Sequence, residues 1–201
     1  LITKADGTKF GKSESGTVWL DAKKTSPYEM YQFLVNSEDA KVIEYLKRFT
    51  FLDKEEIDRL EECVAQEPHL REAQKALARE VVTFLHGSAA YETALKITNA
   101  LFKGNIRDLN ADEQRDALNS MEKRSLQEPM DLASMLVTTK IASSKREARE
   151  WIKSGSIQIN GERVKEETLM IDPSHVLVDD MILVKRGKRN YYVVSLTRET
   201  E

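Results

Sequence analysis

Apolar residues recur three and four positions apart along residues 27–121, which is the period of helices with one buried face. The stretch Ser26–Glu29 predicts the first helix start. Its serine can cap, its proline fits the first helical position and its glutamate can complete a capping box. Pro68 and Gly87 interrupt the apolar pattern and divide it into successive helices. The pattern therefore predicts an all-α helical bundle over residues 25–121.

The pattern changes after residue 130, where helical and strand-like stretches both occur. Helices are predicted near Asp131–Thr139 and Lys145–Lys153. Strands are predicted near residues 156–160, 176–179, 181–186 and 190–196. A switch from all-helical to mixed patterning predicts a second, small α+β domain over residues 131–201, and hence an α+β multidomain fold.

Two polar segments lie outside these regions. Residues 1–24 are punctuated by glycine and predict a loop with a short strand around Val18–Leu20. Residues 122–130 are mostly polar and include Pro129, so they predict an interdomain linker.

Composition narrows the class of protein. The chain has 201 residues and a formal net charge of −3, so any affinity for nucleic acid has to come from local patches. Cys63 is the single cysteine and cannot form an internal disulfide, which suits a reducing cytosol. No apolar run could span a bilayer and no signal peptide is visible, so we expect a cytoplasmic protein without membrane contact. The chain begins with Leu1 rather than Met, which indicates processing or a fragment of something longer.

The stretch Ser143–Val164 combines a short basic helix with a hairpin signal. Helical spacing places three cations on one face and an apolar set opposite them. The cations are Arg146, Arg149 and Lys153, and the apolar residues are Ala148, Trp151 and Ile152. Gly155 ends the helix, and Asn160-Gly161 predicts a tight turn. This unit could read nucleic acid, although a solvated charged face is the alternative.

A second cationic set lies at a predicted hairpin tip between two apolar strands. It consists of Lys185, Arg186, Lys188 and Arg189. Such cations repel one another unless a polyanion neutralises them, while protection of a sheet edge by charge is the alternative. Because the tip and the basic helix belong to one small domain, a phosphate-binding surface is the favoured interpretation.

The loop Lys4–Ser13 is the third candidate site. Lys9 and Lys12 lie three residues apart in a glycine-containing loop, where ammonium groups and backbone N–H groups can surround a polyphosphate. The P-loop spacing is absent, and a plain surface loop is the alternative.

Metal and nucleophile sites are not indicated. The histidines His69, His86 and His175 are isolated in the sequence, and Cys63 has no partner at ligand spacing. No Gly-x-Ser-x-Gly motif occurs. We therefore expect no metal site in this chain.

Together these segments resemble the C-terminal portion of the bacterial tyrosyl-tRNA synthetases. The stretch Thr3–Ser13 is similar to the K-M-S-K-S loop of class I synthetases, with Phe10 and Gly11 in place of Met and Ser. By this resemblance, residues 1–24 would end the catalytic domain, residues 25–121 would be a helical anticodon-binding domain, and residues 122–130 would be a linker. Residues 131–201 would form a small RNA-binding fold like that of ribosomal small-subunit protein S-four.

The resemblance also implies site residues and partners. The parent enzyme would use ATP to activate tyrosine and would transfer it to tRNA. Catalytic roles would fall to Lys9, Lys12 and Ser13, and ATP binding to Lys9, Gly11, Lys12 and Ser13. The anticodon arm of tRNA would bind Arg146, Arg149, Lys153, Lys185, Arg186, Lys188 and Arg189.

The sequence also lacks two features of the family's catalytic domain. No His-x-Gly-His signature and no alternating strand and helix region are present, so this piece alone is expected to be inactive. The parent would be a homodimer through the missing catalytic region, and the piece a monomer. The alternative function is a stand-alone RNA-binding module with a helical protein-interaction domain. DNA encoding the residues before Leu1 would discriminate the two hypotheses.

Overall fold

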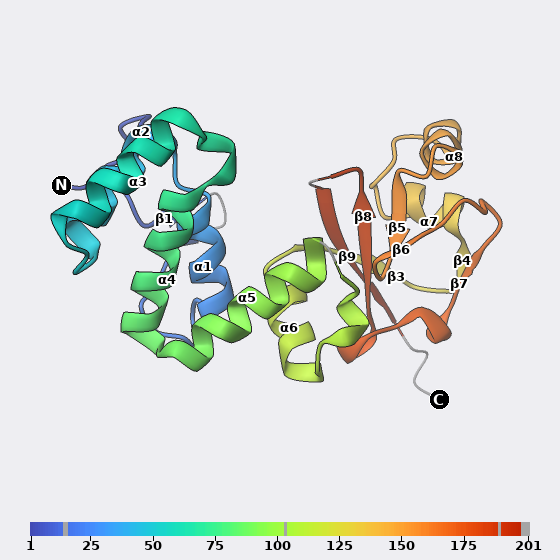
Figure 1. Cartoon of the computed structure of the whole chain (residues 1–201). Coiled ribbons are helices and arrows are strands. Elements are labelled where there is room, and N and C mark those ends of the chain that lie inside the picture. The colour runs from blue at the N-terminus through green and yellow to red at the C-terminus, as the bar shows by residue number, and fades with distance from the viewer. Residues whose placement is uncertain (14–15, 103, 189, 198–201) are drawn as a thin grey trace. The chain divides into compact units, whose positions relative to one another are not determined.

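The computed structural model describes residues 1–13, 16–102, 104–188 and 190–197, which form two compact units, 1–96 and 97–201. The first unit is built from helices with one short two-stranded pair near its start, and the second from helices and a mixed sheet (Figure 1). The predicted α+β class is therefore confirmed. Among the described residues, no helix has the length and apolar character needed to cross a membrane.

The first unit contains the helical bundle that the apolar period predicts. Its helices are α1 (Pro27–Val35), α2 (Asp39–Phe49), α3 (Lys54–Gln66), α4 (Glu72–His86) and the start of α5 (Ser88–Phe102). Helix α4 packs against α1, α2 and α3, with Leu46, Leu60 and Leu77 fully buried. The capping box at Ser26 and Glu29 is formed as predicted.

Arg71 closes the junction between α1 and α2. Its guanidinium donates hydrogen bonds to the carbonyl oxygens of Val35 (2.8 and 3.1 Å) and Ser37 (2.8 Å). These acceptors lie at and just beyond the end of α1, where carbonyls lack helical partners. The long side chain therefore ties the start of α4 to the end of α1.

The second unit is organised around a five-stranded sheet. The strand order is β3 (Glu122–Leu126), β9 (Asn190–Leu196), β8 (Met181–Arg186), β5 (Ile157–Ile159) and β6 (Glu162–Arg163). A separate pair joins β4 (Met130–Asp131) to β7 (Met170–Ile171). Helices α7 (Leu132–Thr138) and α8 (Lys145–Lys153) lie on one side of the sheet (Figure 1) and share its apolar core.

The segment predicted as a linker is part of this sheet, so that prediction is wrong. Strand β3 pairs in parallel with β9 from Glu122 opposite Tyr192 to Leu126 opposite Leu196. Leu126 is fully buried in the core of the second unit. The mostly polar composition is explained by an edge strand whose residues before Leu126 are exposed or half-buried.

The predicted boundary after residue 121 also differs from the structure. Helix α6 (Ala111–Asn119) lies in the second unit, where Arg115 binds Asp179 through two contacts of 2.7 and 3.1 Å. The apolar period shows which face of a helix is buried but not which domain buries it, and this explains why the predicted boundary falls after α6.

Two predicted strands are also corrected. Residues 178–180 form a 3-10 turn in which Asp179 and Asp180 have φ of 54° and 56°, values that an extended strand cannot adopt. Near the N-terminus, strand β2 covers Gly16–Thr17 rather than Val18–Leu20.

Asn160 holds three segments of the second unit together. Its side chain is buried, donates to the carbonyl of His175 (2.6 Å) and accepts from the backbone N–H of Leu183 (2.9 Å). Its φ of 52° is one that asparagine tolerates better than most residues, and the predicted tight turn with Gly161 is present. One side chain therefore joins the β5–β6 turn to β8 and to the 3-10 turn Pro173–His175.

We expect Asn160→Ala to lower the free energy of unfolding by about 3 kcal/mol. The change leaves the N–H of Leu183 and the carbonyl of His175 without their side-chain partner. It also puts alanine at a positive φ, which alanine adopts less readily than asparagine. Urea unfolding would measure the loss. Asn119→Ala is the matched control, since Asn119 is exposed and should change stability by less than about 0.5 kcal/mol. Equal effects of the two substitutions would contradict this role.

We expect the backbone N–H groups of β3 that bond to β9 to exchange with solvent more slowly than those of Gln127 and Glu128. The β3 groups belong to a sheet, whereas the two following residues are exposed between strands. Hydrogen exchange followed by NMR would test this. Uniformly fast exchange across residues 122–128 would restore the linker interpretation.

Candidate nucleic-acid interface

Helix α8 presents cations because of its local sequence. Ser144 caps the helix by accepting from the N–H of Glu147 (3.2 Å). Ala148 and Ile152 are buried, whereas Arg146, Arg149 and Lys153 are all exposed. The arrangement of faces predicted from helical spacing is confirmed for these residues.

Glu147 braces the start of α8. Its carboxylate accepts from the N–H and the hydroxyl of Ser143, both at 2.7 Å. These two hydrogen bonds hold the pKa of Glu147 below its ordinary value, and the nearby Arg186 charge acts in the same direction. The carboxylate is therefore ionised and fixed beside the hairpin tip.

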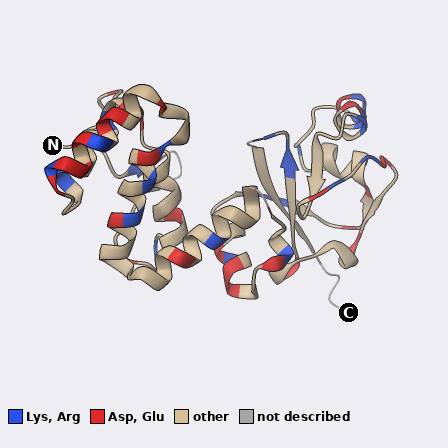
Figure 2. Ribbon diagram, viewed as in Figure 1, with Lys and Arg blue, Asp and Glu red and all other residues tan. Residues whose placement is uncertain are grey.

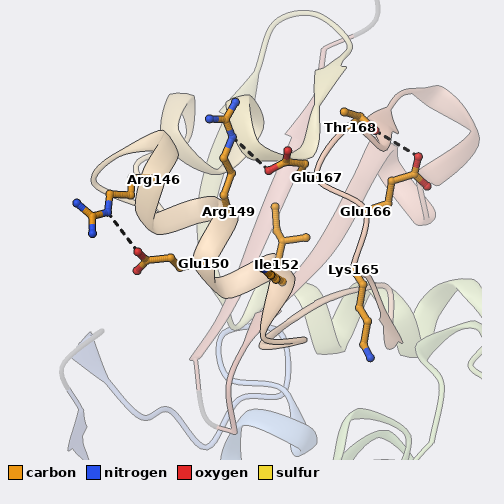
Figure 3. Close-up of a pocket in the computed structure, with 9 residues that line it drawn as sticks. Arg146, Arg149, Glu150, Ile152, Lys165, Glu166, Glu167 and Thr168 are labelled. Carbon is orange, nitrogen blue, oxygen red and sulfur yellow. Dashed lines mark hydrogen bonds and ion pairs between the residues drawn. The ribbon is translucent and has the colours of Figure 1, made fainter.

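A surface groove runs along the other flank of α8 (Figure 3). It is lined by Arg146, Arg149, Glu150, Ile152, Lys153, Lys165, Glu166, Glu167 and Thr168. Arg149 points toward Glu167 with a closest contact of 3.2 Å, and Arg146 pairs with Glu150 at 3.3 Å. These pairs are exposed and weak, so their arginines can exchange a carboxylate for a phosphate.

The hairpin tip brings a second set of cations to the same helix. The guanidinium carbon of Arg186 lies 4.3 Å from the centre of the Trp151 ring, and the Lys185 amine lies 4.9 Å from the centre of the Tyr191 ring. Lys188 is exposed at the turn, and the predicted residue Arg189 lies outside the described residues. The contact with Trp151 places Arg186 against the flank of α8 that also carries Glu147. Figure 2 shows basic residues at the end of β8 and mixed charges on α8.

Trp151 belongs to the apolar set expected opposite the cations, but it is not fully buried as Ala148 and Ile152 are. Its side chain is half-buried and packs against the core from outside, with Arg186 over its ring. It follows Glu147 by one helical turn, so it lies on the flank that faces the hairpin rather than on the face of Ile152.

Sequence analysis missed two cations of this surface. Lys165 lines the groove, and Arg163 lies across Gly155, where an added Cβ would come within 3.1 Å of its Cδ atom. Gly155 follows α8 with a φ of 69°, and its backbone lies close to the side chains of Arg163 and Lys165. The alternation of Arg163 and Lys165 after the Asn160-Gly161 turn was the available signal.

The loop with the predicted ATP-binding residues lies in the first unit. Lys9 and Lys12 are exposed, Gly11 has a φ of 85°, and Lys12–Ser13 forms strand β1, which pairs with β2. The structure describes only the backbone of Ser13. Between the two lysines, Phe10 turns inward.

Phe10 anchors this loop to the bundle, which the sequence did not reveal. Its ring centre lies 4.4 Å from that of Tyr45, 5.1 Å from that of Phe49 and 5.2 Å from that of Phe33. The Tyr45 hydroxyl donates to the Thr3 carbonyl (2.9 Å). Burial, followed by the charge of Glu38, raises the Tyr45 pKa above its ordinary value, so the hydroxyl stays protonated as a donor.

Among the described residues, no group of three or more histidine, cysteine, aspartate or glutamate side chains could hold a metal ion. Both candidate sites present exposed ammonium or guanidinium groups, which can bind phosphate.

Two family models match the chain. Residues 1–103 match the family described as "tRNA synthetases class I (W and Y)". Residues 113–194 match the one described as "Tyrosine--tRNA ligase SYY-like C-terminal domain".

Individual relatives agree with these matches. The chain is 50% identical over 195 residues to "Tyrosine--tRNA ligase" of Staphylococcus carnosus (strain TM300), which covers 96% of this chain and 46% of the relative. The protein of the same name from Staphylococcus haemolyticus (strain JCSC1435) is 49% identical over 196 residues, covering 97% of this chain and 47% of the relative. The chain thus spans about half the length of both relatives.

One solved structure extends the comparison. The "Solution structure of tyrosyl-tRNA synthetase C-terminal domain" is 31% identical and covers 48% of this chain and 98% of its own, with a TM-score of 0.39.

We expect Phe10→Ala to lower the free energy of unfolding of the first unit by about 1–2 kcal/mol, since a half-buried aromatic ring is lost from its cluster. The control is Phe51→Ala, because Phe51 is 87% exposed and should change stability by less than about 0.5 kcal/mol. Urea unfolding would compare the two variants. If Phe10→Ala lowers the free energy of unfolding no more than Phe51→Ala does, then Phe10 does not anchor the loop to the bundle.

Proposed function

Because the chain belongs to the class I tRNA synthetase family of the tryptophan and tyrosine enzymes, we propose that it is the tRNA-binding portion of a tyrosine–tRNA ligase. Such an enzyme activates tyrosine with ATP and transfers it to tRNA. The structural observation that carries the proposal is the row of exposed cations on α8, formed by Arg146, Arg149 and Lys153.

The second unit would bind tRNA chiefly through its phosphates. Arg146, Arg149 and Lys153 on α8, with Lys185, Arg186, Lys188 and Arg189 on the hairpin, are the proposed contacts. Arginine suits this task because its planar N–H fork can bind two phosphate oxygens. Exposure of the α8 cations and their exchangeable carboxylate partners support the assignment. These contacts would hold the tRNA without reading its sequence.

The bundle of the first unit would contact the anticodon region, and the second unit would be a small RNA-binding fold like that of ribosomal protein S-four. The support for these finer assignments is the family match of residues 1–103 and 113–194. Reading of unpaired anticodon bases requires base-edge contacts, for which α1 to α5 offer polar side chains.

The Lys9–Ser13 loop would bind the phosphates of ATP. Lys9 and Lys12 would offset charge that develops on the pyrophosphate leaving group, an electrostatic role. Ser13 and the backbone at Gly11 would complete the phosphate site. Exposure of both lysines beside the Phe10 anchor supports this proposal. The chain has no His-x-Gly-His signature, so these residues would supply only one part of the reaction.

The alternative of a stand-alone RNA-binding module is less well supported. The synthetase family match begins at residue 1 and includes the candidate ATP loop. A module without enzymatic ancestry has no need of such a loop.

We expect Arg146→Ala and Arg149→Ala each to weaken binding of a tyrosine-accepting tRNA and to reduce the slope of log affinity against log salt by about 0.7–0.9. That reduction corresponds to one lost phosphate contact. Both side chains are exposed, so stability should change by less than about 0.5 kcal/mol. Fluorescence titration of the 201-residue chain at several salt concentrations would measure both effects.

Arg107→Ala is the matched control. Arg107 is likewise an exposed arginine of the second unit, but it lies outside α8 and the hairpin. It should leave the salt slope unchanged. Unchanged slopes for Arg146→Ala and Arg149→Ala would reduce the α8 surface to a solvated charged face.

A further inference from the structure

The Arg186 side chain is held in one place by several neighbours. Its backbone ends β8, paired with Ile157 of β5 and Asn190 of β9. Its guanidinium lies over the Trp151 ring at 4.3 Å. The Glu147 carboxylate, itself held by Ser143, lies within electrostatic range. An exposed arginine side chain normally samples many rotamers. The rotamers of Arg186 are restricted by the Trp151 ring against its guanidinium and by the strand pairing of its backbone.

The supporting ring is also fixed. Trp151 belongs to α8, and its carbonyl accepts from the N–H of Ser156 (2.9 Å) and the hydroxyl of Ser154 (3.0 Å). Its side chain packs against the buried core of the second unit. Because the Trp151 ring is held against the core, it also fixes the position of the Arg186 guanidinium that lies over it.

We propose that Trp151 is a positioning residue for RNA binding: its ring holds the Arg186 guanidinium so that the N–H edge meets a phosphate. The proposal rests on the proposed function, since it assigns a role within the same surface.

A stacked guanidinium keeps its donors available. The cation–π contact uses the face of the group, while the N–H donors lie in its plane and point outward. Stacking therefore costs no phosphate contact, and it removes rotamers before the RNA arrives. Ordering a binding group in advance lowers the entropy lost on association. No other cation of the hairpin tip that the structure describes stacks on a ring of α8.

A double-mutant cycle on the 201-residue chain tests the proposal. The variants are Trp151→Leu, Arg186→Ala and the combination, titrated with a tyrosine-accepting tRNA transcript. We expect Arg186→Ala to weaken binding about fivefold at 150 mM salt, as loss of one phosphate contact implies. Trp151→Leu should weaken binding about two- to threefold, and it should have no further effect when Arg186 is already alanine.

Trp151→Phe separates positioning from structure. Phenylalanine keeps an aromatic face, although a weaker one, so it should recover at least half of the affinity lost in Trp151→Leu. If Trp151→Leu lowers the folded fraction, the NMR signal of the Arg186 Nε–H in the unmodified chain provides a second measurement. Ring stacking should shift that signal, and saturating tRNA should shift it again.

The outcomes are distinguishable. Normal binding by Trp151→Leu, with weak binding by Arg186→Ala, would overturn the positioning role and leave the proposed function standing. An undiminished loss in the combined variant would also overturn it, because the two side chains would then act independently. Normal binding by Arg186→Ala would remove the hairpin from the RNA surface, and the positioning role with it. An Arg186 Nε–H signal that saturating tRNA leaves in place would have the same meaning.

Discussion

Asn160 joins three segments of the second unit that are separated in the sequence, and the candidate RNA surface depends on this junction. The side chain accepts from Leu183 on β8 and donates to His175, while its backbone forms the turn after β5. These bonds fix the register of β5 against β8, which places Arg186 opposite Ile157. Since α8 leads into β5 through Gly155, the same register sets the distance from Trp151 to Arg186.

The charge distribution of the chain bears on how an acidic protein would present the proposed polyanion-binding surface. The net charge of −3 gives no long-range attraction, and carboxylates occupy the same surface as the cations. Arg146 and Arg149 each lie beside a glutamate that a phosphate would have to replace. One phosphate gains little binding free energy by replacing one glutamate. A nucleic-acid backbone gains that free energy at several positions at once. This favours a structured polyanion over small anions.

Local sequence signals predicted the local structure well. The capping box at Ser26 and the exposed cations of α8 follow from spacings of three and four residues. Contacts between distant segments were not predictable in this way. Nothing in the composition of residues 122–126 indicates a partner strand at 192–196, and nothing near Phe10 indicates the rings of α1 and α2. Helical spacing assigns Trp151 to a face of α8, but it does not reveal that the Arg186 side chain lies over the ring.

The parallel pairing of β3 with β9 has a consequence for the order of events during synthesis. Leu126 pairs with Leu196, so helices α7 and α8 and strands β4 to β8 all lie between two residues that meet in the native sheet. Contacts between such distant residues form late, because a long loop has to close first. The ribosome must therefore release β9 before the sheet can close. The hairpin with Arg186 shares β9, so the proposed tRNA-binding surface cannot assemble on a nascent chain until β9 has left the ribosome.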